Sequence, residues 1–193
     1  MTGVKIQRLS DLGSNRIKEA AQFTVHQFRE MFLSISEDEE AFILLFMKAM
    51  VVEQCFVAIA EDKVVGIVGV STPVRGAFEV SLKEVQGCLG FFKGLKFYFN
   101  LVNSGLTLKP YQIYINTLAV DEAYRRLGIG TLLLEECMLK SCGHEYLLDV
   151  IDVNTGALKL YESLGFKVLK RKKQMFAKQA GFNECIYMSK RLR

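Results

Sequence analysis

The sequence predicts an α/β fold, with a mixed twisted sheet of about six or seven strands, helices on both faces and a helical insertion at about residues 73–110. Three observations support this expectation. Short β-branched runs alternate along the chain with longer segments in which apolar residues recur every three or four positions. Two of those runs flank a brief polar turn, which is typical of a hairpin. The two prolines, Pro73 and Pro110, bracket a stretch that is neither strand-like nor a short loop.

The first third of the chain is expected to contain two helices and a hairpin. Apolar residues at helical spacing predict a helix from Arg16 to Phe32. The segment Ser36 to Glu39 resembles a capping box that opens a second helix. The runs 56–60 and 64–70 are apolar and separated by three polar residues, so they predict an antiparallel pair of strands.

An aromatic helix is expected inside the insertion. Its apolar residues recur at helical spacing, at Phe91, Phe92, Leu95, Tyr98, Phe99 and Val102. Three interpretations of this face remain open. It packs on the core or on a second subunit, it forms the wall or lid of a substrate pocket, or it touches a membrane surface.

The second half of the chain alternates strands and helices. Glycine at position 165 follows a helix where a left-handed C-terminal cap is expected. The expected elements are a strand at 111–120, a helix at 128–141, a strand at 146–150, a helix from Asn154 to Leu164, and strands at 166–171 and 184–189. This alternation indicates a sheet with helices on both faces.

Composition limits the class of protein. With 193 residues, the chain has the length of a single domain, 1–193, with a substantial core. The N-terminus lacks the layout of a signal peptide, and no apolar stretch approaches the roughly 20 residues of a membrane span. We therefore expect a cytoplasmic protein with no membrane span.

Two further features bear on metals and partners. The five cysteines form no CxxC pair, so free thiols are favoured over disulfides or a metal site, and no metal is expected. The basic run Lys170 to Lys173 has no recognisable binding module around it, so no nucleic-acid partner is expected.

The segment from Ile115 to Leu133 is the most informative for function. A β-branched run passes through an acidic dipeptide and two arginines into Gly128 and Gly130, and a leucine-rich helix follows. The N–H groups at a helix start are free to bind an anion, and two arginines placed there suggest that one binds. The segment is not a P-loop, because no lysine follows Gly130, and not a dinucleotide fingerprint, because position 133 is leucine.

What remains resembles a known family. Arg125-x-x-Gly128-x-Gly130 is similar to the [Q/R]xxGx[G/A] motif of the GNAT (Gcn5-related) N-acetyltransferases, which bind acetyl-coenzyme A (acetyl-CoA). A second block, from Asn154 to Phe166, resembles the family's NxxAxxLYxxxGF segment, and the closing residues 186–192 look like its last strand. The resemblance is close over 111–193, holds in outline over 1–72, and fails over 73–110.

The resemblance implies which residues hold acetyl-CoA. In the family, backbone amides of the glycine loop and the following helix hold the pyrophosphate, and the strand before them faces the pantetheine arm. The corresponding positions here are Leu118, Ala119, Val120, Arg125, Arg126, Leu127, Gly128, Ile129, Gly130, Thr131 and Asn154. Two alternatives stay open, because the glycines also suit a plain strand-to-helix turn and Asn154 also suits a simple helix cap.

The resemblance also implies two catalytic residues. Tyr161 matches the family's general acid, although it equally continues an apolar row that packs on the sheet. Asp149 lies in a strand, where aspartate is disfavoured, and some members that acetylate protein N-termini carry a carboxylate there. Buried, it would have a raised pKa and act as the base, but it could equally anchor a neighbouring loop. Weaker candidates for the base are Asp152, His144, Glu79 and Glu84.

The leading hypothesis is therefore an N-acetyltransferase that moves an acetyl group from acetyl-CoA to a primary amine in one ternary complex. A small-molecule amine is slightly favoured over a protein N-terminus, because the insertion departs from the ribosomal-protein acetyltransferases that the last third resembles. The alternative is a catalytically inactive, CoA-binding regulatory or interaction domain. The oligomeric state is open, and a homodimer is possible.

Overall fold

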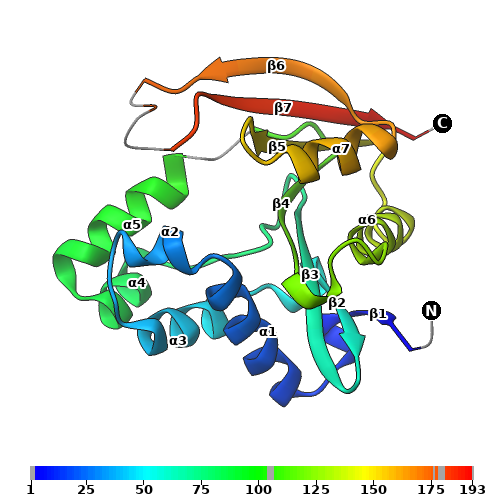
Figure 1. Ribbon diagram of the computed structural model, residues 1–193. Coiled ribbons are helices and arrows are strands. Elements are labelled where there is room, and N and C mark those ends of the chain that lie inside the picture. Colours follow the sequence, from blue (N-terminus) through cyan, green and yellow to red (C-terminus); the bar gives the residue numbers. More distant parts are fainter. Residues whose placement is uncertain (1–2, 104–106, 176, 178–180, 193) are drawn as a thin grey trace.

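The computed structural model describes residues 3–103, 107–175, 177 and 181–192, and its strands form one seven-stranded sheet. The order is β1-β2-β3-β4-β5-β7-β6, and every neighbouring pair is antiparallel except β4 and β5, which are parallel (Figure 1). The strands are β1 (Lys5–Arg8), β2 (Cys55–Ala60), β3 (Lys63–Ser71), β4 (Gln112–Val120), β5 (Glu145–Ile151), β6 (Lys167–Lys173) and β7 (Glu184–Arg191).

Helices cover both faces of this sheet. One face carries α6 and α7, and the other carries α1 to α5 (Figure 1). The helices are α1 (Ser14–Gln27), α2 (Arg29–Leu33), α3 (Glu39–Ala49), α4 (Leu82–Leu89), α5 (Phe91–Asn103), α6 (Ile129–Lys140) and α7 (Thr155–Ser163). The predicted fold class is confirmed. In the described part of the chain, no helix is both long enough and apolar enough to cross a membrane.

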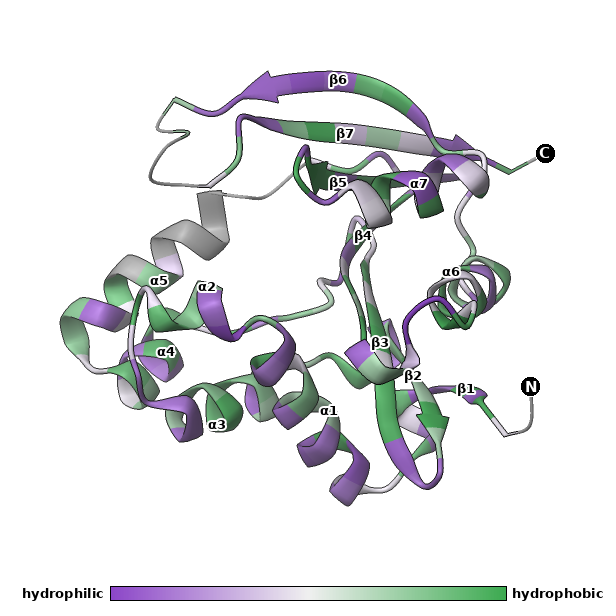
Figure 2. Cartoon of the chain, viewed as in Figure 1, coloured by the Kyte–Doolittle hydropathy of each residue, from purple (hydrophilic) through white to green (hydrophobic). Residues whose placement is uncertain are grey.

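The sheet separates two apolar clusters, and strand alternation explains them. Phe56 and Ala58 of β2 point into the cluster under α6 and α7, whereas Cys55 and Val57 point into the cluster under α1 to α5. Successive side chains of a strand face opposite sides, so a strand covered on both sides reads as an unbroken apolar run. Figure 2 shows this in β2 and β3, which are hydrophobic along most of their length.

Two expectations in the N-terminal third need correction. The predicted helix from Arg16 to Phe32 is interrupted at Phe28, whose backbone leaves the helical region (φ −109°, ψ 22°) between α1 and α2. The capping residue of α3 is Asp38, whose carboxylate accepts from the Ala41 N–H at 3.0 Å, and not Ser36. β1 was not predicted, because four residues at a sheet edge carry too short an alternation to detect.

The insertion differs from its prediction in two ways. It contains two helices, of which α4 begins with a capping box between Ser81 and Glu84. On α5 the buried ring is Phe97, whereas Phe91 and Phe92 of the expected apolar face are 62% and 83% exposed. Periodicity alone did not reveal which side of α5 meets α3 and α4. The side chains of Phe99 and Val102 lie outside those that the structure describes.

Candidate active site

The centre of the site is a gap between β4 and β5. These strands pair over Gln112–Ile115 and Glu145–Leu148, although β4 continues to Val120 and β5 to Ile151. The separation begins at a β-bulge in β4. Gly69 pairs with Thr117 and Val70 with Ile115, which leaves Asn116 as the extra residue. A bulge bends its strand, so the C-terminal half of β4 diverges from β5 and exposes backbone groups along that edge.

A charged cluster holds the other end of the two strands together. Glu145 of β5 is buried and accepts from Gln112 Nε2 of β4 at 2.7 Å and from Arg191 Nε of β7 at 3.0 Å. These donors lower the pKa of the Glu145 carboxyl, the Gln112 bond most of all. Side-chain hydrogen bonds therefore join β4, β5 and β7 at one end of these strands, whereas β4 and β5 separate at the other end.

The loop after β4 leads from the open end to α6. Asp121 caps a short 3-10 helix, η3 (Glu122–Tyr124), by accepting from the Ala123 N–H at 2.9 Å. Arg125 Nε then donates to the Val120 carbonyl at 3.2 Å. Two residues of the loop, Arg126 (φ 63°) and Gly128 (φ 79°), take left-handed backbone angles. Such angles turn successive N–H groups toward one side, which is the geometry of an anion-binding nest.

The turn after β4 has several features that are typical of an anion-binding site. In the described residues, the N–H groups of residues 126–131 donate to no backbone acceptor, and no side chain caps α6. Residues 125–128 are exposed, and a Cβ at Gly128 would have nothing within 4 Å. Unpaired N–H groups, a helix N-terminus and two arginines therefore lie together at this turn, and the part formed by residues 125–128 is open to solvent. Gly130 differs, because its Cβ would lie 3.0 Å from Leu160 Cδ2, so packing against α7 explains that glycine.

Asn154 is a helix cap in this structure. Its side-chain oxygen accepts from the Ala157 N–H at 3.1 Å and so begins α7, directly after β5. Asn154 therefore caps α7, as the alternative interpretation expects. The residue is also exposed, so it is accessible to a ligand, and its contact with the coenzyme stays a prediction.

Asp149 lies at the mouth of the gap, and its exposure to solvent differs from the burial that the sequence suggested. It is exposed on β5 and not buried. Its Oδ1 accepts from the Tyr114 hydroxyl of β4, and its Oδ2 accepts from the Cys185 thiol of β7 at 3.1 Å. The carboxylate thus joins three strands and does not anchor a loop. Burial, the hydrogen bond to Asp149 and its charge raise the pKa of the Cys185 thiol to about 12.

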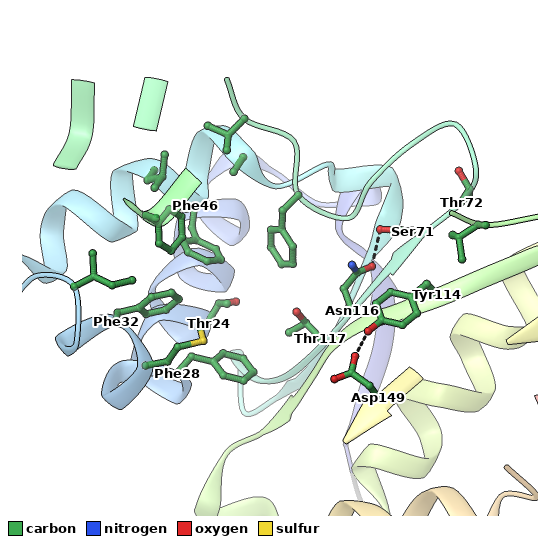
Figure 3. A pocket seen from close by; sticks show the side chains of 18 of the residues that line it. Thr24, Phe28, Phe32, Phe46, Ser71, Thr72, Tyr114, Asn116, Thr117 and Asp149 are labelled. Atoms are coloured by element: carbon green, nitrogen blue, oxygen red, sulfur yellow. Dashed lines mark hydrogen bonds between the residues drawn. The ribbon is translucent and has the colours of Figure 1, made fainter. Parts of the chain in front are cut away.

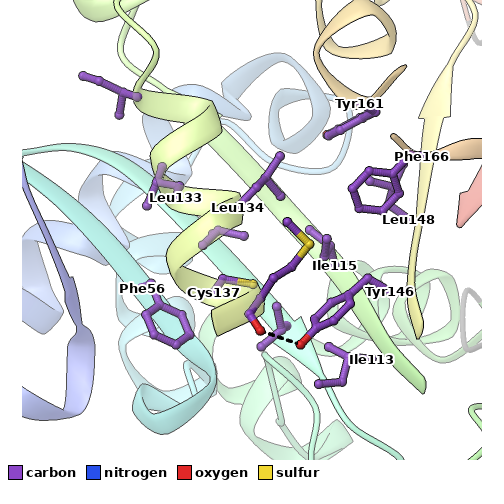
Figure 4. Close-up of a cluster of buried hydrophobic side chains, with 14 of the residues drawn as sticks. Phe56, Ile113, Ile115, Leu133, Leu134, Cys137, Tyr146, Leu148, Tyr161 and Phe166 are labelled. Atoms are coloured by element: carbon purple, nitrogen blue, oxygen red, sulfur yellow. Dashed lines mark hydrogen bonds between the residues drawn. The ribbon is translucent and has the colours of Figure 1, made fainter. Parts of the chain in front are cut away.

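Tyr161 projects from α7 into the apolar cluster between the helices and the sheet. It is 6% exposed, and its ring centroid lies 5.9 Å from that of Phe166 (Figure 4). Burial, followed by the charge of Asp149, raises the pKa of its phenol to about 12. The hydroxyl therefore keeps its proton throughout the neutral range, and Tyr161 also packs as the alternative interpretation expects.

A pocket of about 800 Å³ opens beside Asp149 and extends toward α1, α2, α3 and α5. Figure 3 shows Asp149, Tyr114 and Asn116 gathered at the strand end and Phe rings at the helix end. Ser71 Oγ donates to Asn116 Oδ1 at 2.6 Å, which fixes the bulge side chain at the strand end. Phe97 of α5, which was not part of the expected apolar face, lines the pocket and is also buried in the core.

The weaker candidates for the base have structural partners or lie elsewhere. Glu84 completes the capping box of α4, and Glu79 accepts from the Gly76 N–H at 2.8 Å. Asp152 accepts from the backbone and side chain of Asn183. His144 is exposed and does not line the pocket. In the described residues, no three His, Cys, Asp or Glu side chains are grouped to hold a metal ion.

Three residues of the site, Tyr114, Asn116 and Cys185, are not marked as functional by any pattern in the sequence. Tyr114 and Asp149 come together because β4 and β5 are parallel neighbours with Tyr114 opposite Leu147. Cys185 reaches Asp149 because β7 inserts between β5 and β6. Strand order and register set both contacts, and the local pattern of residues carries no signal for either.

A match to a protein family identifies the class to which this chain belongs. The model of the Acetyltransferase (GNAT) family matches residues 19–166. The chain therefore belongs to the GNAT family of acetyltransferases, as its motifs predicted.

Curated relatives share short segments with the chain. It is 38% identical to an N-alpha-acetyltransferase of Sulfurisphaera tokodaii over 90 residues, 45% of this chain and 49% of that protein. It is 48% identical to the human N-alpha-acetyltransferase 30 over 61 residues, 30% of this chain and 17% of that protein. The chain thus spans about half the length of the first relative and about a sixth of the second.

Solved structures agree over the whole fold. An N-acetyltransferase from Staphylococcus aureus superposes with a TM-score of 0.64 at 18% identity, over 96% of this chain and 100% of that one. Ard1 from Thermoplasma volcanium superposes with a TM-score of 0.57 at 16% identity, over 100% of this chain and 99% of that one. At these identities the likeness concerns the fold.

Proposed function

We propose that this chain is an acetyl-CoA-dependent N-acetyltransferase, that it transfers the acetyl group directly to a primary amine in a ternary complex, and that residues 1–193 act as one catalytic domain. The observation that carries the proposal is the gap between β4 and β5. In the described residues, a turn with unpaired N–H groups lies at the end of β4, and a carboxylate facing a pocket lies across the gap on β5. A donor and an acceptor bound on these two sides would meet between the strands.

The donor side would hold acetyl-CoA, which supplies an acetyl group activated as a thioester. The free N–H groups of residues 126–131 and the guanidinium groups of Arg125 and Arg126 would bind its diphosphate. The backbone of Leu118, Ala119 and Val120, on the edge of β4 that β5 leaves unpaired, would bind its amide-containing arm. Asn154 stands at the start of α7, beyond the end of β5, and is the remaining proposed contact.

The acceptor side must remove a proton from the amine. An alkylammonium group has a pKa of about 10.4 and is not nucleophilic until it loses a proton. Asp149 is the candidate base, because its carboxylate is exposed at the pocket and held by Tyr114 and Cys185. These hydrogen bonds orient it without enclosing it, which leaves the carboxylate accessible to an amine or a bridging water.

Tyr161 is the candidate acid. The departing thiolate, with a thiol pKa of about 8.5, is best stabilised by a proton donor close to it. The Tyr161 phenol is protonated at every pH near neutrality, since its pKa is about 12. The charge of Asp149 contributes to that pKa, so the two candidate groups lie close enough to influence each other.

A small-molecule amine remains our preferred acceptor over a protein N-terminus. The names of the relatives favour an N-terminus, since the human and archaeal proteins are called N-alpha-acetyltransferases. The pocket favours a small amine. It is bounded by helices α1, α2, α3 and α5, and the insertion supplies Phe97 to its wall.

One pair of measurements tests the proposal. Calorimetry measures the binding of acetyl-CoA, and thiol release measures transfer to a panel of primary amines and to peptides with free N-termini. We expect micromolar binding and acetylation of at least one amine, with the N-acetyl product found by mass spectrometry. Tight binding with no transfer to any acceptor would support the inactive regulatory domain instead.

A further inference from the structure

We infer that the acceptor is a small primary amine that carries one positive charge on an aromatic or branched apolar body. This inference rests on the proposed function, and it goes beyond that function by naming the chemical class of the substrate. It depends on the shape, the charge and the polarity of the pocket beside Asp149.

A wall of phenylalanines forms the helix end of the pocket. The rings come from the α1–α2 junction, α2, α3, the segment before α4, and α5, and they are Phe28, Phe32, Phe46, Phe78 and Phe97. Phe46 connects the wall, because its ring centroid lies 5.2 Å from that of Phe32 and 5.3 Å from that of Phe78. Phe32 and Phe97 are 3% and 8% exposed. Rings held by one another in this way present a firm apolar surface, against which another ring packs favourably.

The charged side chain of the pocket lies at its strand end, opposite the phenylalanine wall. Among the described residues that line the pocket, only Asp149 and Tyr114 have ionisable side chains, and only Asp149 is charged at neutral pH. One ammonium group can therefore be paired at the strand end. A second positive charge on the same molecule would reach the phenylalanine wall without a carboxylate to pair with. Cation–π attraction to the rings contributes about 0.5–2 kcal/mol, which is less than the cost of taking an unpaired ammonium group from water into an apolar site. The pocket thus discriminates against diamines and polyamines.

The polarity of the lining gives the acceptor a direction. Asp149, Tyr114 and Asn116 mark the strand end, where the transfer would take place (Figure 3). Phe28, Phe32 and Phe46 mark the helix end. An amine at Asp149 would therefore extend its body toward the rings, and an apolar body would leave water for that surface. The volume of about 800 Å³ lies within the range of small-molecule sites, about 300–1,000 Å³.

A polypeptide is less compatible with the same wall. Every residue of a peptide brings an N–H and a carbonyl that need hydrogen-bond partners once buried. The phenylalanine rings offer none. Thr24 and Ser34 line the pocket from the helix side, but their hydroxyls already donate to the carbonyls of Ala20 and Met31. The side chains of Tyr114, Asn116 and Asp149 stand at the strand end (Figure 3). A peptide could place its first side chain in the pocket, so a peptide with an apolar N-terminal residue belongs in the test.

The test compares acceptors that share the same amine group. Steady-state kcat/KM is measured with acetyl-CoA and 2-phenylethylamine, ethylamine, 1,5-diaminopentane, or a tetrapeptide that begins with phenylalanine. Burial of the phenyl ring should favour 2-phenylethylamine over ethylamine by about ten- to a hundredfold. The diamine should be no better than ethylamine. The inference would be overturned if kcat/KM were highest for the diamine or for the peptide, or if it were equal for ethylamine and 2-phenylethylamine.

A pair of variants then locates the preference in the pocket. Phe46→Ala removes the central ring of the wall, and Phe92→Ala removes a ring that is 83% exposed and does not line the pocket. We expect Phe46→Ala to lower kcat/KM for 2-phenylethylamine at least tenfold and to leave that for ethylamine within twofold, with Phe92→Ala unchanged for both. If Phe46→Ala does not fold by circular dichroism, Phe46→Leu replaces it, with a smaller loss of the same kind.

The outcomes separate the inference from the proposed function. Transfer to no acceptor at all, with acetyl-CoA bound, contradicts the proposed function. Transfer that does not favour the monocationic aromatic amine contradicts the inference alone. Equal losses for both amines in Phe46→Ala would also contradict it, since the ring would then support the fold and not the acceptor.

Discussion

At the scale of single residues, the hydroxyl of Tyr161 gives the most direct test of the proposed chemistry. We expect Tyr161→Phe to lower kcat by about a hundredfold or more, the usual contribution of a positioned acid. The ring and its packing against Phe166 remain in this variant, so the affinity for acetyl-CoA and the fold should be preserved. Single-turnover kinetics and calorimetry check this expectation. An unchanged kcat would leave Tyr161 as a packing residue.

The same residue predicts part of the pH profile. Its pKa is raised from 10 to about 12, so the protonated phenol is present at all pH values below about 10. Any fall in kcat between pH 7 and pH 10 must therefore have another cause.

Asp149 gives a second prediction, which depends on the amine. At pH 7 an alkylamine is almost entirely protonated, so Asp149→Asn should lower kcat/KM by about a hundredfold. Near pH 10.5 half of the amine is already neutral, and the loss should shrink to a few fold. Rate measurements across this range check the convergence. A loss that stays constant with pH would show that Asp149 positions the substrate and takes no proton.

Part of the site was predictable from single residues, and part was not. Gly128, Arg125 and Arg126 stood out because two arginines and a glycine before an apolar helix have few structural explanations. Asp149 stood out because aspartate is unusual within a strand. Tyr114 and Cys185 did not, because tyrosine suits any strand and a lone cysteine is most often buried. Their role appears when three strands bring them to one carboxylate.

At the scale of elements, the loop before α6 can be tested by a matched pair of glycines. Gly128 and Gly165 both have left-handed angles, φ 79° and 86°, and a Cβ at either would meet nothing within 4 Å. A valine at either position should cost about 1–2 kcal/mol of stability. Gly128→Val should in addition weaken acetyl-CoA binding at least tenfold, because its side chain would enter the proposed cradle. Calorimetry on both variants decides whether the loss is specific to Gly128.

The contact between α4 and α5 gives a second prediction at this scale. A Cβ at Gly94 would lie 2.8 Å from Gln86 Cα and 3.0 Å from Gln86 N, and these backbone atoms cannot rotate away. Gly94→Ala should therefore separate the helices, displace Phe97 from the pocket and lower the melting temperature. At the exposed position of Gly87 on α4 a Cβ would meet nothing, so Gly87→Ala should stabilise the protein by about 0.5–1 kcal/mol. Equal melting temperatures for the two variants would contradict this account.

The elements also show where sequence patterns lose their information. The hairpin of β2 and β3 was predicted because its alternation and its turn are local. The gap between β4 and β5 was not predicted from periodicity, because it depends on one extra residue, Asn116, opposite a partner strand 45 residues earlier. Of the two helices in the insertion, α5 was predicted from its aromatic residues and α4 was not, because α4 is only eight residues long.

At the scale of the whole molecule, titratable groups lie in both apolar clusters. Cys55 lies in the cluster under α1 to α5, and Cys137 and Tyr161 lie in the cluster under α6 and α7. Burial raises the pKa of both thiols from 9 to about 12 and that of the phenol from 10 to about 12. The pH dependence of stability therefore reports on both faces of the sheet together.

The sign of this dependence follows from proton binding. Above pH 9 the unfolded chain loses the thiol protons, whereas the folded chain keeps them until about pH 12. The unfolded state then binds fewer protons, so the free energy of unfolding falls as pH rises, by about 1.4 kcal/mol per pH unit for each group. Below pH 9 these groups contribute no slope. Urea unfolding at pH 8, 9, 10 and 11 measures the decline.

A matched pair of substitutions assigns the decline to the buried thiols. Cys55→Ala should reduce the slope above pH 9 by about 1.4 kcal/mol per pH unit, because it removes one of the groups that ionise only on unfolding. Cys142→Ala, at an exposed cysteine, controls for the removal of a thiol from the chain. A free energy of unfolding that stays level from pH 8 to pH 11 in the parent protein would show that water reaches the interior thiols. The two apolar clusters would then be more accessible to water than their burial between the sheet and the helices indicates.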